Sequence, residues 1–137
     1  MVKLAFIGTN EGNGHIFSWS AIVNGRYNLD LMKECGYPVI VDYLSKQPPE
    51  NLGISDAYVT HVWTEDKETA IKVAKTTYIE NVIDTPEQAI GKVDAAVITT
   101  DIGSSHIHLA KPFIEAGLPV FIDKPLADNE QDLKTFY

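Results

Sequence analysis

Short apolar runs alternate with segments of helical character along the whole chain. The runs end at glycine, threonine or a charged residue, which is typical of buried strands. Strands that alternate with helices favour right-handed crossovers and a parallel sheet covered on both faces. The pattern therefore predicts an α/β fold with a doubly wound, Rossmann-type parallel sheet. We expect strands at residues 2–7, 57–63, 81–83, 95–100 and 120–122, with a further short strand at 39–41.

Polar residues with capping ability mark where the intervening helices begin. Asn28 and Asp66 precede two of the helical segments, and Asp128 precedes the last one. Thr85-Pro86 predicts another helix start, because proline suits the first helical position. Pro112 predicts a kink or break in a helix that Ser104 or Ser105 opens. The expected helices are 15–23, 29–35, 66–75, one from 85, 104–116 and one from 128.

A turn-rich loop follows the first strand, where ligands of such sheets bind. Glycine allows close approach to a pyrophosphate, and the next helix offers free N–H groups. The loop departs from the G-x-G-x-x-G fingerprint, because Asn10 and Asn13 stand at its second and third glycine positions. An ordinary strand-to-helix turn is the alternative, and His15 just after the loop either touches a phosphate or faces solvent. The candidate cofactor-binding residues here are Gly8, Thr9, Asn10, Gly12, Asn13 and Gly14.

Thr64, Glu65 and Asp66 follow the second long strand. A carboxylate at this place commonly accepts hydrogen bonds from the ribose of NAD. The alternative is that Asp66 only caps the next helix. The acid normally lies about 20 residues beyond the glycine loop. The separation here is much longer, so we expect an insertion around residues 26–56.

Two later strand ends also carry polar residues. Thr99, Thr100 and Asp101 follow one strand, and Asp123-Lys124-Pro125 follows the last. A lysine at a strand end beside an acid suits proton transfer or the orientation of a substrate hydroxyl. A solvated lysine before a turn is the alternative.

The segment from Asp94 to Ala127 resembles the Gfo/Idh/MocA family, named after glucose-fructose oxidoreductase and inositol dehydrogenase. The similarity rests on D-A-A-V-I-T-T at 94–100, on His106, and on E-A-G-L-P-V-F-I-D-K-P-L-A at 115–127. The family pattern is approximately D-A-V-x-I-A-T-P-N-x-x-H, followed by E-A-G-K-H-V-x-x-E-K-P-L-A.

The resemblance implies a role for several of these residues. Lys124 matches the family lysine beside nicotinamide and substrate, and is our candidate catalytic residue. Asp123 replaces the family glutamate, and Asp101 stands where the family prefers proline. Thr64 falls where the ribose-binding acid is usual, which leaves NAD or NADP open as the cofactor. The candidate cofactor-binding set therefore also includes Thr64, Glu65, Thr99, Thr100, Asp101, His106, Asp123 and Lys124.

The family also carries a second, C-terminal α/β domain, which supplies a catalytic histidine and most of the substrate pocket. Nothing follows Tyr137 in the sequence. We therefore expect one NAD(P)-binding domain over residues 1–137, truncated relative to the family and unable to complete catalysis alone. An exposed domain interface favours self-association, so a homo-oligomer is expected.

Composition narrows the possible partners. The formal charge is −8 and the eleven basic residues are scattered, which disfavours nucleic-acid binding. No apolar run is long enough to span a bilayer, and no secretory signal is present, so a cytoplasmic location is the expectation. Cys35 is the one cysteine, which excludes an intrachain disulfide, and no metal site is expected.

Three functions compete at this point. The first is the NAD(P)-binding domain of a dehydrogenase that acts on a sugar, polyol or related hydroxy compound by hydride transfer. The second is a dinucleotide-binding or sensing module without turnover. The third is a receiver-like signalling domain, which requires paired acids after the first strand for Mg²⁺. Gly8-Thr9-Asn10 at that place argues against the receiver.

Overall fold

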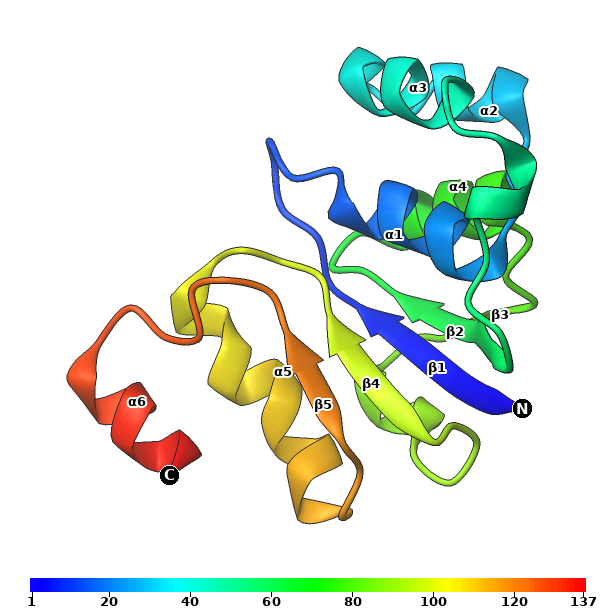
Figure 1. The fold of residues 1–137 in the computed structure, drawn as a ribbon. Helices are drawn as coiled ribbons and strands as arrows, with labels where there is room; N and C mark the ends of the chain where they lie inside the picture. The colour runs from blue at the N-terminus through cyan, green and yellow to red at the C-terminus, as the bar shows by residue number, and fades with distance from the viewer.

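Five parallel strands form a single sheet in the order β3-β2-β1-β4-β5. The computed structural model describes residues 1–137. Figure 1 shows the sheet running diagonally through the molecule. This order and the parallel pairing confirm the predicted Rossmann-type sheet. The strands are β1 (Val2–Ile7), β2 (Ala57–Trp63), β3 (Asn81–Val82), β4 (Ala95–Ile98) and β5 (Val120–Ile122).

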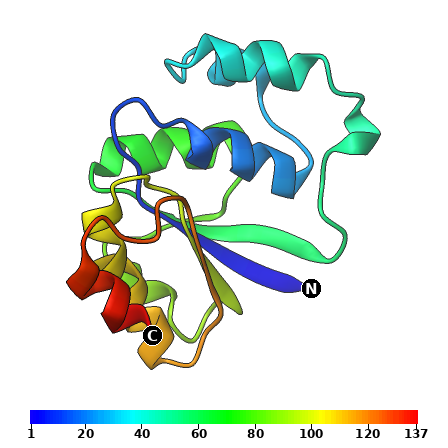
Figure 2. The same cartoon turned by 60° about the vertical axis from the view of Figure 1, so that its left-hand side comes forward.

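Helices cover both faces of the sheet. Helices α1 and α4 lie on one face and α5 on the other, while α2 and α3 form an outer layer beyond α1 (Figure 2). The helices are α1 (His15–Asn24), α2 (Leu29–Lys33), α3 (Pro38–Ser45), α4 (Lys67–Thr77), α5 (Gly103–Glu115) and α6 (Glu130–Phe136). Two short 3-10 turns, η1 (Pro49–Asn51) and η2 (Pro86–Ala89), complete the elements. None of the helices combines the length and the apolar character that a membrane crossing requires.

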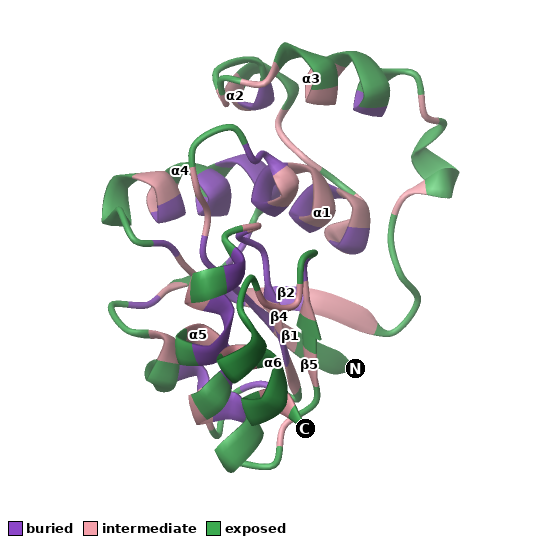
Figure 3. Cartoon of the chain, turned by 90° about the vertical axis from the view of Figure 1, so that its left-hand side faces the viewer, coloured by how far each residue is buried: buried purple, intermediate pink, exposed green.

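Alternation along β1 divides the core into two halves. Phe6 points toward α1 and α4, whereas Ala5 and Ile7 pack on the side of α5. Side chains of a strand alternate between faces, so one short strand serves both halves. Figure 3 shows the buried residues gathered along the inner strands and the helix faces that meet them.

One part of the sheet remains open on the α1 side. Phe121 of β5 points outward there and is 61% exposed. Together with Trp19 and Val97 it borders an apolar groove of about 310 Å³. The groove lies between α1 and the sheet, beside β1, β4 and β5. The homo-oligomer expected from such a surface stays a prediction.

Two of the three predicted acid or amide caps are confirmed. The side chain of Asn28 accepts from the N–H of Leu31, and that of Asp66 accepts from the N–H of Thr69. The predicted cap of the last helix, Asp128, is wrong by one residue. Asn129, and not Asp128, accepts from the N–H of Asp132.

The predicted strand at 39–41 is wrong, because these residues belong to helix α3. Pro38 occupies the first turn of that helix, where its missing N–H costs nothing. Ile40 and Leu44 are four residues apart and both face the core beneath α3. A three-residue apolar run fits one helical face as well as a strand.

Three other helix predictions also need correction. The helix expected from Thr85 is only the 3-10 turn η2. Neither Ser104 nor Ser105 caps α5, which begins at Gly103 after Ile102. Pro112 does not break α5, which runs on to Glu115. Pro112 removes one N–H donor, whose intrahelical acceptor would be the carbonyl of the exposed residue His108, where water can replace the donor.

His61 of β2 makes folding sensitive to acid. Its side chain is 7% exposed, and burial, followed by the charges of Lys92 and Lys3, lowers its pKa below the ordinary value of 6.5. The unfolded chain then takes up a proton at a higher pH than the folded chain, so stability is full above about 6.5 and falls as the pH drops toward the folded pKa. When the pH is lowered from 7.5 to 5.5 (about one unit either side of the ordinary value), we expect the urea concentration at the midpoint of unfolding to decrease. This decrease should be smaller in His61→Gln. An equal decrease in both proteins would assign the acid sensitivity to other groups.

Candidate functional site

Asn10 joins the loops that follow β1 and β4. Its side-chain oxygen accepts from the Thr100 hydroxyl at 2.7 Å and from the Asp101 N–H at 2.9 Å. Its side-chain nitrogen donates to the Asp101 carboxylate at 2.7 Å. Strand β1 lies between β2 and β4, so this is the point where the strand order reverses and where open α/β sheets bind ligands. The asparagine that replaces a fingerprint glycine therefore fixes the loop at the ligand-binding edge.

Asn13 extends this network to the end of β5. Its side-chain nitrogen donates to the Thr99 carbonyl at 3.2 Å and to the Asp123 carboxylate at 3.3 Å. Its side-chain oxygen accepts from the N–H of His15 at 2.8 Å. The loop after β1 is thus held to the ends of β4 and β5 before any ligand arrives.

The tip of this loop keeps free donors. The backbone N–H groups of Glu11 and Gly12 have no acceptor within the chain, while Asn10 pairs with Asn13 in an isolated antiparallel bridge. Gly12 adopts φ +82°, and an added Cβ there would meet nothing within 4 Å. Free N–H groups near the start of α1 are the kind of donors that bind phosphate. The loop therefore fits a pyrophosphate although its glycine spacing is unusual.

Gly8 and Gly14 serve two other close approaches. Gly8 has φ +92°, and a Cβ there would come within 3.3 Å of Thr100 and Leu109. At Gly14 a Cβ would come within 2.5 Å of Ile40 and 2.9 Å of Tyr37. The segment around α3 thus packs directly on the start of α1, which only glycine permits.

The strand end after β2 places one acid in the site. The Glu65 carboxylate accepts from the Thr9 N–H at 2.9 Å. Thr64 is buried, and its hydroxyl turns to the Asp66 carbonyl. Asp66 itself caps α4. Of the three predicted residues, Glu65 is therefore the one whose side chain reaches the glycine loop.

A groove of about 340 Å³ runs beside this loop, with Glu65 and Asp66 on one wall. Its size falls in the range of small-molecule sites. Tyr37, from the segment expected to be an insertion, contributes to another wall. The groove is lined by Thr9, Asn10, Glu11, Phe17, Cys35, Tyr37, Glu65, Asp66, Thr69 and Lys72.

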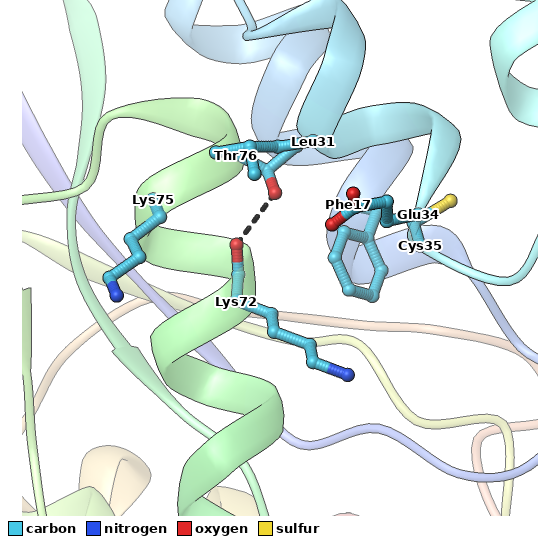
Figure 4. A pocket seen from close by; sticks show the side chains of 7 residues that line it. All are labelled: Phe17, Leu31, Glu34, Cys35, Lys72, Lys75 and Thr76. Carbon is cyan, nitrogen blue, oxygen red and sulfur yellow. Dashed lines mark hydrogen bonds between the residues drawn. The ribbon is translucent and has the colours of Figure 1, made fainter.

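A smaller pocket of about 90 Å³ adjoins the groove between α2 and α4. Figure 4 shows Phe17 and Cys35 to the right of α4 and the Lys72 side chain extending below them. The Thr76 hydroxyl donates to the Lys72 carbonyl at 2.7 Å and so stays within α4. The pocket and the groove share Phe17, Cys35 and Lys72. Lys72 is the one basic residue among those that line the groove.

Lys124 lies exposed just after β5, next to the buried Asp123. The Asp123 carboxylate accepts from the Lys124 N–H at 2.8 Å, and the peptide bond to Pro125 is cis. His106 is fully buried, and its ring nitrogens face the carbonyls of Thr100 at 2.6 Å and Leu126 at 3.2 Å. His106 thus connects two site loops and presents no free polar atom to a ligand in this conformation.

A family model for the Gfo/Idh/MocA proteins, described as "oxidoreductase family, NAD-binding Rossmann fold", matches residues 38–137. The matched part includes the ends of β2, β4 and β5. The chain belongs to the Gfo/Idh/MocA oxidoreductase family. This confirms the family that the motifs around Lys124 had indicated. A search of curated protein sequences found no match.

Solved Gfo/Idh/MocA-like structures share the fold at low sequence identity. The UDP-N-acetylglucosamine 3-dehydrogenase of Acidithiobacillus ferrooxidans matches with a TM-score of 0.63 and 16% identity over 98% of this chain and 33% of its own. The scyllo-inositol dehydrogenase of Lactobacillus casei, with bound NAD(H) and scyllo-inositol, matches with a TM-score of 0.62 and 14% identity over 98% of this chain and 31% of its own. The myo-inositol 2-dehydrogenase of Lactobacillus plantarum matches with a TM-score of 0.62 and 16% identity over 97% of this chain and 31% of its own. The chain thus spans about a third of the length of these structures.

The structure brings most of the predicted family residues to one edge of the sheet, and it adds one contact that the sequence analysis missed. His15 pairs with Asp123, with Nδ1 2.6 Å from the carboxylate. The two residues are 108 positions apart. Only the place of each, directly after a strand end or its loop, hinted that they could meet.

Proposed function

We propose that this chain binds NAD and forms the dinucleotide-binding part of a dehydrogenase that acts on a sugar, polyol or related hydroxy compound. The observation that carries the proposal is the loop after β1. It presents the free N–H groups of Glu11 and Gly12 while its side chains hold it to the ends of β4 and β5. A rigid donor set at the switch point of a parallel sheet suits a pyrophosphate.

Each end of a bound dinucleotide has suitable residues. The groove beside Glu65 and Tyr37 would hold the adenosine end. The edge formed by Thr100, Asp123 and Lys124 would hold the nicotinamide end. His106 would act at this end as a positioning residue, because it connects the carbonyls of Thr100 and Leu126.

Lys124 would orient the substrate. Its ammonium group has no carboxylate partner within the chain, so it is free to donate to a substrate hydroxyl. The dinucleotide, when bound, accepts the hydride in a reaction of this class. The substrate class is proposed from the solved relatives, which include inositol and UDP-sugar dehydrogenases.

Amide chemical shifts test the site directly. On addition of NAD⁺ to the ¹⁵N-labelled chain, we expect the largest shift changes at Thr9, Asn10, Glu11 and Gly12. The amides of α6, away from this loop, serve as the internal control and should move little. Changes confined to the outer layer of α2 and α3 would contradict the proposed site.

The charges around the groove predict a preference between the two dinucleotides. Glu65 and Asp66 line it and would repel a 2′-phosphate, while Lys72 alone would attract one. We expect NAD⁺ to bind at least tenfold more tightly than NADP⁺, a difference of about 1.4 kcal/mol. Glu65→Gln keeps an acceptor for the Thr9 N–H but removes the charge. It should therefore bring the Kd values for NAD⁺ and NADP⁺ closer together.

Glu68→Gln provides the matched control for this preference. Glu68 is an exposed acid on the first turn of α4 and does not line the groove. Calorimetric titration of both variants with NAD⁺ and NADP⁺ gives the ratios. Equal ratios in wild type and Glu65→Gln would show that Glu65 does not select the cofactor.

A further inference from the structure

The ring of His15, at the start of α1, is a second protonatable group near the end of β5, where it contacts Asp123. The side chain of Asp123 is 4% exposed and that of His15 is 37% exposed. The buried carboxylate has three donors around it: His15 Nδ1 at 2.6 Å, the Lys124 N–H at 2.8 Å and Asn13 Nδ2 at 3.3 Å. One carboxylate thus orients His15 and holds the backbone of Lys124.

The direction of this contact fixes which ring nitrogen is available. An ionised carboxylate only accepts, so the proton of a neutral His15 ring sits on Nδ1. Nε2 then keeps its lone pair, and it has no hydrogen-bond partner within the chain. Catalytic histidines are often held in this way by a carboxylate that accepts from one ring nitrogen and leaves the other free to take a proton.

Aromatic packing holds the ring in place. His15 stacks on Trp19 with the ring centres 4.4 Å apart and the planes 10° from parallel. Trp19 in turn meets Phe121 of β5 edge-on at 6.0 Å. The ring also borders a hollow of about 400 Å³ between α1 and α3, which leaves room for a small molecule beside it.

We infer that His15 is a proton acceptor of the nicotinamide site and that Asp123 is its positioning residue. The inference rests on the proposed function. In oxidation of a carbinol, the C–H electron pair leaves as hydride to the nicotinamide dinucleotide, and the O–H proton passes to Nε2 of neutral His15 as the carbonyl forms. Asp123 offsets the charge that His15 gains, and the partly exposed ring returns the proton to solvent. Lys124 donates to the same oxygen and keeps it oriented.

The tautomer of His15 is the first test. Long-range ¹H–¹⁵N spectra of the neutral ring should show the proton on Nδ1, and Asp123→Asn should abolish that preference. A ring with its proton on Nε2 in the wild-type chain would overturn the proposal. Should Asp123→Asn fail to fold, the wild-type tautomer still decides.

Acylation of Nε2 by diethyl pyrocarbonate is the second test, followed by mass spectrometry of the His15 peptide. His15 should react, and NAD⁺ at ten times its Kd should slow the reaction by about tenfold. The exposed His108 of α5 should react at the same rate with and without NAD⁺. His15→Gln identifies the signal.

The outcomes distinguish the role of His15 from the binding of NAD⁺. NAD⁺ that binds by calorimetry but leaves the His15 reaction unchanged would overturn the role of His15 and leave the proposed function standing. A His15 ring that does not react would do the same. No binding of NAD⁺ would remove the proposed function, and the role of His15 with it.

Discussion

Replacing Phe113 with alanine is expected to lower the free energy of unfolding by about 3–5 kcal/mol. Phe113 is fully buried on α5, in the half of the core that includes Ala5, Ile7 and Ile98. The substitution removes a ring that joins the helix to the sheet and leaves a cavity that close-packed neighbours fill only in part. Urea unfolding followed by circular dichroism measures the change.

Phe121→Ala is the matched control, because it removes the same side chain from a site that is 61% exposed. Its ring packs edge-on against Trp19 at the border of the apolar groove. We expect a loss below about 1 kcal/mol, in line with surface substitutions. Similar losses in the two variants would mean that the side chain of Phe113 is not the one that joins α5 to the sheet.

Lys124→Ala is expected to reduce turnover by the proposed dehydrogenase by about a hundredfold or more, because hydride transfer depends on alignment of the substrate at contact distance. Affinity for NAD⁺ should stay within about tenfold of wild type, since the pyrophosphate donors lie in the loop after β1. Steady-state kinetics with a panel of polyols and sugars, together with calorimetry for NAD⁺, measures both quantities.

Lys111→Ala provides the control for a lost surface charge. Lys111 is an exposed lysine of α5 whose ammonium lies 3.8 Å from Glu115. Its loss should leave both turnover and affinity near wild type. Normal turnover in Lys124→Ala would show that Lys124 is a solvated lysine at a turn and has no catalytic role.

The strands were predictable because each is a short apolar run with a distinct end. All five expected core strands exist, and their parallel pairing follows from the alternation of strands and helices. The outer layer was harder to predict. Residues 39–41 have the composition of a strand, but no neighbouring strand lies within reach, and Pro38 starts a helix instead.

The site was predictable one strand end at a time, but its contacts were not. Asn10 and Asp101 are 91 positions apart, as are the Lys3 and Asp94 that meet at the opposite end of the sheet. A spacing rule for glycines treats Asn10 as a defect, whereas in the fold its amide makes the hydrogen bonds that hold the loop. Such contacts depend on which strands become neighbours, and local sequence carries that information only indirectly.

Calorimetric titration of the wild-type chain with NAD⁺ tests the central claim most directly. We expect saturable binding to one site with a Kd of roughly 10 μM to 1 mM, or about −7 to −4 kcal/mol. Asn10→Ala, which removes the link to the β4 loop, should bind at least several-fold more weakly. Absence of heat and of any shift in melting temperature at millimolar NAD⁺ would contradict the account.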